Sequence, residues 1–188
     1  MKKAIKILVI LLAFSIVLNG FVIVGRTEAA SSVLEGWSNR IQLKIDHTKI
    51  SAPLTNFPVL IHLSNASGIN KADVSAIFNT LGNSGKKIAV TTADGVTQCN
   101  VEIESWDSTS RQAYLWVKVP VISNTADTIL YLYYDRNQSD NGLYVGYTGE
   151  AAAQKVWDEH FVMVQHFAQS GAGVPGEYVD STSHQNNG

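Results

Sequence analysis

Alternation of apolar and polar residues with a period of two dominates the chain beyond residue 35 and predicts β-strands. Ile41, Leu43 and Ile45, for example, alternate with polar residues, as expected for a strand with one buried face. Pro58 lacks a ladder donor and restricts its own segment to a sheet edge or a strand start. The strand segments predicted in this way are 40–45, 56–63, 88–92, 98–106, 113–121 and 128–135.

Turn-forming residues separate the predicted strands and define the fold class. Asp94-Gly95, between two of them, is a strong hairpin signal. The period changes at Val74, Ile77 and Phe78, whose spacing of three and four predicts one or two helical turns. We therefore predict an all-β fold, an antiparallel β-sandwich with one short helix, after an N-terminal signal helix.

The first thirty residues have the pattern of a secretory signal peptide. Three lysines in the first six residues precede an apolar run over 7–24 and a small-residue stretch over 27–31. We expect cleavage after Ala29 or Ala30, and hence an extracellular or cell-surface location. An uncleaved anchor is the alternative, because the apolar run is at the short limit for a spanning helix.

Charge narrows the classes of partner. Residues 1–30 hold four of the 14 basic and one of the 16 acidic residues, which leaves 10 basic and 15 acidic residues, a net charge of −5, over 31–188. Such a chain lacks the basic surface that nucleic-acid binding requires. We expect no nucleic-acid partner, and membrane contact only through the N-terminal signal or anchor segment.

Composition changes after the last predicted strand. Residues 136–147 are rich in Asn, Asp, Ser and Gly, and 150–155 fit a short helix or linker. A new apolar segment follows at 156–167, and 171–188 is rich in Gly, Ser and Asn without a closing strand. We therefore place the β-sandwich domain at 31–147 and a different unit at 148–188.

Five short segments, in order, carry a resemblance to a known family. They are Trp37, Arg40 with the strand after it, Leu54–Ile61, Leu115–Pro120 and Leu130–Tyr134. Over residues 36–147 the chain resembles the domain of unknown function 2341 family, although Asp135 stands where that family usually has Gly. The family has no established activity and recurs in large bacterial and archaeal surface proteins.

The C-terminal segment carries a second resemblance. Residues 156–167 and 178–188 are similar to the first strand and turn of concanavalin A-like (laminin-G-type) jelly rolls, which commonly follow the first family. The resemblance implies that 148–188 is a linker and the incomplete start of such a domain in a longer protein. It also implies that calcium would belong to the missing part of the jelly roll; we expect no cofactor in this chain.

The sequence contains no recognisable catalytic constellation. Glu102, Glu104 and Trp106 would share one face of a strand, but glycoside hydrolysis needs carboxyl groups on opposite sides of the sugar. We therefore expect the two glutamates on a solvated strand face. Cys99 is expected to be a buried structural thiol. The histidines lack the spacing of metal ligands, so we expect no metal site. Because no catalytic constellation is recognisable, we also expect no enzyme activity in this chain.

Aromatic residues on neighbouring strands are the candidate ligand-binding residues. Sugar-binding modules expose such rings, but rings also pack against each other in cores and between domains. The candidates are Trp106, Trp116, Tyr114, Tyr131 and Tyr133.

The expected function is that of an exported accessory module at the cell surface or in the medium. Its role would be to recognise a polysaccharide or other glycan, or to present an adjacent lectin-like domain. Two alternatives stay open: the non-catalytic N-terminal part of an extracellular glycoside hydrolase, and a structural spacer of an adhesin-like surface protein.

Overall fold

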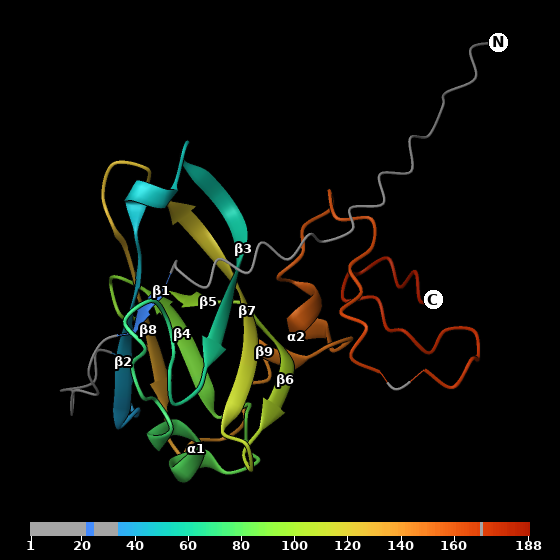
Figure 1. Cartoon of the computed structure of the whole chain (residues 1–188), viewed down its shortest axis with the longest axis horizontal. Coiled ribbons are helices and arrows are strands. Elements are labelled where there is room, and N and C mark those ends of the chain that lie inside the picture. Colours follow the sequence, from blue (N-terminus) through green and yellow to red (C-terminus); the bar gives the residue numbers. More distant parts are fainter. Residues whose placement is uncertain (1–21, 25–33, 170) are drawn as a thin grey trace.

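Two β-sheets pack face to face in the computed structural model of the chain, which describes residues 22–24, 34–169 and 171–188 (Figure 1). The first sheet has the order β1 (Val22–Val24), β2 (Asn39–Ile45), β8 (Thr128–Tyr134), β4 (Ile88–Thr92), β5 (Gln98–Cys99). The second has the order β3 (Leu54–Leu63), β7 (Gln112–Ile122), β6 (Val101–Asp107), β9 (Val145–Tyr147). The predicted all-β sandwich is confirmed.

Only short helical elements accompany the described strands. A 3-10 turn, η1, covers His47–Lys49. Helix α1 covers Ala76–Leu81 and helix α2 covers Ala151–Gln154. The helix predicted from the apolar spacing therefore forms at the later residues of that segment, and Ile77 and Phe78 are buried as the spacing required.

The apolar residues that set the period of two form a single core between the sheets. Ile41, Leu43 and Ile45 of β2 are at most 1% exposed and share this core with Leu115 and Val117 of β7. Burial of branched side chains from both inner faces is the main contribution to the stability of a sandwich. The hydrophobic pattern thus specifies both the strands and their register.

Three details differ from the pattern expected of the strands. The segment predicted as one strand over 98–106 is divided at Asn100, because β5 belongs to the first sheet and β6 to the second. Strand β9 arises in a segment predicted to be a loop, and it pairs with β6 in parallel, whereas the other described pairs are antiparallel. Pro58 lies on β3, an edge strand, as predicted.

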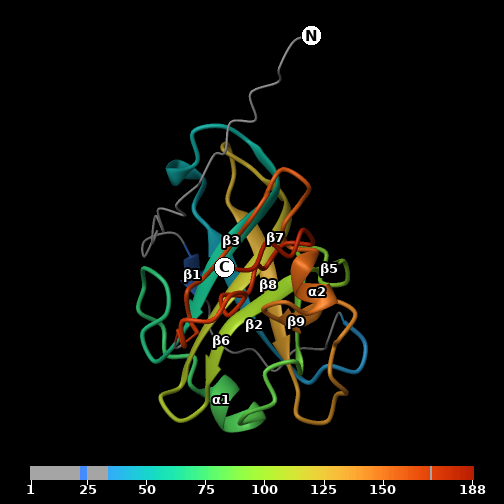
Figure 2. The same cartoon turned by 90° about the vertical axis from the view of Figure 1, so that its right-hand side faces the viewer.

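The C-terminal segment, residues 148–188, lies against the outer face of the second sheet (Figure 2). Helix α2 packs over β9, and a Cβ on Gly146 would come within 2.9 Å of the Ala153 backbone nitrogen. A side chain at Gly146 would therefore push α2 away from the sheet. Within the described part of 156–188 there is no strand, only an isolated bridge between Gln165 and Asp180.

The predicted signal helix and its cleavage site lie outside the described residues, except for the three residues of β1, which pair with β2. Among the residues that the structure describes, no helix is long and apolar enough to cross a membrane.

Candidate functional site

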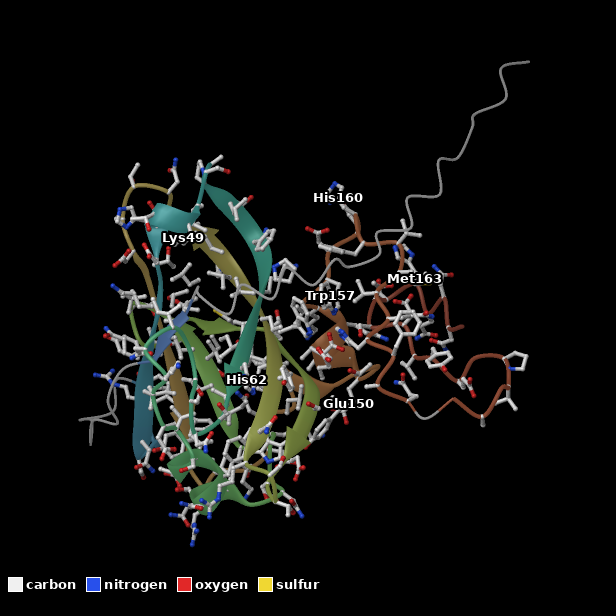
Figure 3. The ribbon with its side chains drawn as sticks, viewed as in Figure 1. Lys49, His62, Glu150, Trp157, His160 and Met163 are labelled. Carbon is white, nitrogen blue, oxygen red and sulfur yellow. The ribbon has the colours of Figure 1, made fainter. Side chains whose placement is uncertain are left out.

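A buried polar cluster joins the second sheet to the C-terminal segment, and we call it the Glu102 cluster. Figure 3 shows its region, where Trp157 points from the segment toward the sheet. The members of the cluster are Glu102, Glu104, Trp116, Thr148, Trp157, His166 and Ser181.

Glu102 is the centre of this cluster. The Glu102 side chain is fully buried. Its carboxylate accepts hydrogen bonds from the Thr148 hydroxyl at 2.7 Å, the Trp157 indole N–H at 2.6 Å and the Ser181 hydroxyl at 2.6 Å. A buried carboxylate is tolerated only when its oxygens are satisfied in this way. Three separate points of the C-terminal segment are thereby tied to one residue of β6.

His166 adds an ionic contact to the same carboxylate. Its Nε2 lies 3.3 Å from Glu102 Oε1, although poorly aligned for a hydrogen bond, and its Nδ1 lies 3.4 Å from Glu104 Oε2. Burial by itself would lower the pKa of His166, but the contact with Glu102 and the negative charges of both glutamates outweigh burial and raise the pKa above 6.5. The imidazole is thus favoured in its charged form between two carboxylates.

Aromatic packing covers the Glu102 end of the cluster. The rings of Trp116 and Trp157 have centroids 5.3 Å apart, and His166 stacks on Trp116 at 5.8 Å. Phe161 packs edge-on against Trp157 at 5.3 Å. The Trp116 indole N–H donates to Glu104 at 2.7 Å, so both indole donors of this layer are satisfied by glutamates of β6.

The expectation of a solvated glutamate face is wrong for Glu102, because the C-terminal segment covers this part of β6. The expectation that Trp106 shares that face is also wrong. A β-bulge shifts the β6–β7 register between Ile103 and Ser105, and Trp106 then pairs with the buried Ala113 and packs against the core. Its indole N–H donates to the Gly82 carbonyl at 2.8 Å.

The remaining candidate aromatic residues lie on different faces. Tyr114 is on the outer face of the second sheet, near Trp116, and stacks on His62 at 4.6 Å. Tyr131 and Tyr133 are on β8, in the first sheet. Tyr133 is fully buried and donates to a loop carbonyl, and the Arg40 guanidinium covers the Tyr131 ring at 4.4 Å. The structure therefore separates the five candidates into three places.

Two other groups of reactive residues have local partners. Cys99 is free and buried, as predicted, and burial raises the pKa of its thiol to about 12. Asp46, His47 and Asp127 gather within 4.8 Å, but Asp127 already pairs with the Lys44 ammonium at 2.8 Å and with His47 at 2.7 Å. A lysine and a histidine thus already occupy the carboxylate that a cation would need.

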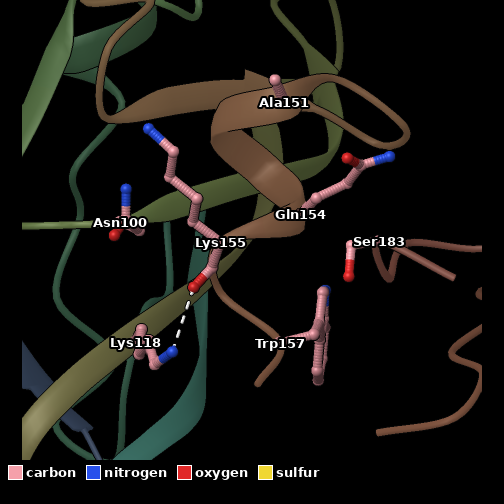
Figure 4. Close-up of a pocket in the computed structure, with 7 residues that line it drawn as sticks. All are labelled: Asn100, Lys118, Ala151, Gln154, Lys155, Trp157 and Ser183. Carbon is pink, nitrogen blue, oxygen red and sulfur yellow. Dashed lines mark hydrogen bonds between the residues drawn. The ribbon is translucent and has the colours of Figure 1, made fainter. Parts of the chain in front are cut away.

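An open depression of about 460 Å³ lies beside the Glu102 cluster, at the seam between the second sheet and α2 (Figure 4). Its lining residues are Asn100, Lys118, Ala151, Gln154, Lys155, Trp157 and Ser183. The Lys118 ammonium donates to the Lys155 carbonyl at 3.2 Å and so connects β7 to the end of α2.

The Glu102 cluster holds the C-terminal segment against the second sheet. Both carboxylate oxygens of Glu102 are engaged by donors from the segment, and the residue is closed to solvent. A general acid or base must reach a proton on its substrate, directly or through one water. Glu102 offers no such access in this arrangement.

Sequence reasoning did not identify Thr148, Trp157, His166 or Ser181 as members of a common site. Their partner Glu102 is 46, 55 and 79 residues away from Thr148, Trp157 and Ser181. The alternation Val101–Glu102–Ile103 places the glutamate on the outer strand face and carries no signal that another part of the chain covers that face.

The charge of His166 predicts that docking of the C-terminal segment depends on pH. A histidine with a raised pKa contributes stability that is full below its unfolded pKa near 6.5 and is lost as pH rises through the folded pKa. We expect hydrogen-exchange protection of the segment, corrected for intrinsic rates, to be higher at pH 6 than at pH 9. His166→Gln should flatten this difference, and His160→Gln, at an 83% exposed side chain, should not. If His166→Gln kept the same difference in protection between pH 6 and pH 9, the role of charged His166 in docking would be contradicted.

Comparison with known proteins matches part of the chain to a known family. Residues 84–161 match the family described as Domain of unknown function (DUF2341). The match confirms the resemblance over residues 84–147, and it continues past the expected boundary to residue 161, through Trp157 of the Glu102 cluster. No curated protein matches the chain, and no solved structure does.

Proposed function

We propose that this chain is an exported, non-catalytic accessory module that holds its C-terminal segment in a fixed orientation and so presents an adjacent lectin-like domain. The signal-peptide pattern supports export to the cell surface or the medium. The similarity of 156–188 to the opening of a concanavalin A-like jelly roll supports the identity of the presented domain.

The attachment of the segment through Glu102 is the observation that carries this proposal. A flexible linker would place few buried groups on the sandwich, whereas Thr148, Trp157 and Ser181 all donate to one buried carboxylate. Breaking such an arrangement leaves buried polar groups unpaired, which is costly. The segment is therefore suited to transmit the orientation of the sandwich to whatever follows it.

The segment is also ordered internally around Asp180. This residue is 1% exposed, and its carboxylate accepts from the backbone N–H groups of Val164, Thr182 and Asn186, each at 2.9 Å. The Ser181 N–H donates to the Val164 carbonyl at 2.8 Å. An ordered C-terminal segment favours presentation over a flexible spacer.

Glycan recognition through an aromatic strip on the sandwich has less support. Trp116 lies under Trp157 and His166, and Trp106 and Tyr133 are packed inside the sandwich or under its loops. Stacking on a pyranose ring needs an exposed aromatic face. Only an arrangement in which the segment left the sheet would expose Trp116.

Hydrogen exchange of the full chain tests the proposal. We expect the amides of Val164, Ser181 and Asn186 to exchange through the same large-scale opening as Val117 in the core strand β7, with protection within about tenfold of it. Thr48, whose amide is held only by the exposed Asp46 turn, is the matched control for local opening. If the segment amides exchange as fast as Thr48, the positioning role is refuted.

A further inference from the structure

The depression between β7 and α2 combines positive charge with sugar-compatible donors and acceptors. We propose that it binds a negatively charged sugar unit, one that carries a carboxylate or a sulfate group, with Lys118 and Lys155 as the anion-binding residues. This assignment depends on the docked segment that the proposed function requires, and it adds a ligand class to it.

The depression carries positive charge that no neighbouring carboxylate neutralises. Two of the seven lining residues are lysines, and none is acidic. Neither lysine has an ion-pair partner anywhere in the described part of the chain. An anion bound in the depression is attracted by both positive charges, which no acidic lining residue offsets. Residues 31–188 carry a net charge of −5, so a depression lined by two lysines and no acidic residue differs from the average charge of the chain.

Both ammonium groups have N–H donors left for a ligand. An ammonium group has three N–H donors, and Lys118 uses one of them on the Lys155 carbonyl at 3.2 Å. Lys155 is exposed, and its ammonium group has no partner within the described residues. The contact places the Lys118 side chain beside the Lys155 backbone, and the Lys155 side chain extends from there past Asn100, so the two ammonium groups lie at different points of the depression (Figure 4).

The other lining groups favour a sugar over a simple anion. The amides of Asn100 and Gln154 and the hydroxyl of Ser183 can each donate to or accept from sugar hydroxyls. The indole of Trp157 supplies an apolar wall next to them. A volume of about 460 Å³ is within the usual range of roughly 300–1,000 Å³ for ligand sites.

Calorimetric titration of the full chain with trisaccharides tests the site. The probes are trigalacturonate, a sulfated galactose trisaccharide and neutral galactotriose, which separate carboxylate, sulfate and uncharged sugar. We expect at least one acidic probe to bind, neutral galactotriose to bind at least tenfold more weakly, and added salt to weaken binding. Lys155→Gln, which leaves the Lys118 contact with the backbone intact, should weaken binding about tenfold, the loss of one charge-assisted hydrogen bond.

Lys49→Gln is the matched control, because Lys49 is an exposed lysine on η1, remote from the depression (Figure 3). Its binding should equal that of the unmodified chain. Equal affinity for galactotriose, no binding of either acidic probe, or an unchanged affinity in Lys155→Gln would overturn the site. If the segment stays protected from exchange while no probe binds, only the site fails; if the segment is unprotected, the proposed function fails with it.

Discussion

Replacing Glu102 by alanine should lower the free energy of unfolding by about 3–5 kcal/mol, the usual cost of removing one partner of a buried ionic group. Three buried donors, on Thr148, Trp157 and Ser181, would lose their acceptor, and the charged form of His166 would lose its nearest counter-charge. For a domain of this size we expect the thermal midpoint to fall by roughly 10 °C, measured by circular dichroism or calorimetry.

Glu159→Ala is the matched control for this substitution. Glu159 is an exposed glutamate on the same C-terminal segment, and removing its side chain should change stability by less than about 0.5 kcal/mol. Glu102→Gln keeps an acceptor oxygen but loses the charge, so its cost should lie between the two. A thermal midpoint of Glu102→Ala within about 2 °C of that of the unmodified chain would show that the carboxylate does not hold the segment.

Replacing Trp157 by alanine should destabilise the chain by a similar amount, about 3–5 kcal/mol, as is typical of a buried Trp. The substitution removes the ring that packs on Trp116 and Phe161, and it removes one donor to Glu102. Urea unfolding measures the loss. Limited proteolysis should show at the same time that cleavage within 158–188 becomes faster.

Two variants separate the contributions of Trp157. Phe167→Ala removes an aromatic ring that is 66% exposed on the same segment, and it should leave both urea unfolding and cleavage nearly unchanged. Trp157→Phe keeps a ring but lacks the indole N–H, so it should cost less than alanine and still leave the Glu102 carboxylate short of one donor. Equal cleavage rates for Trp157→Ala and the unmodified chain would refute docking through this residue.

Much of the sandwich could be predicted from the sequence because its determinants are local. The period of two at Ile41, Leu43 and Ile45 and the turn at Asp94-Gly95 each act within a few residues. Strand β9 was not predicted because its pairing partner is β6, about 44 residues earlier in the chain. A segment so short has no period of its own to read.

The candidate site was less predictable for the same physical reason. Sequence spacing placed Glu102, Glu104 and Trp106 on one face, but a single bulged residue turned Trp106 toward the core. Glu102 was expected in solvent because glutamate is rarely buried without partners, and its partners come from distant residues. No sequence pattern near Glu102 predicts that three donors from another part of the chain will bind one carboxylate.

The amino-acid sequence by itself determined the strands, the apolar core and the secretory pattern of the first thirty residues, because alternation and turn chemistry are short-range properties. Only the tertiary structure decided that the outer face of the second sheet is covered. Docking of residues 148–188 removes Glu102 and Trp157 from water, and whether a polar side chain ends in water or in a satisfied buried network depends on contacts made after the chain has folded.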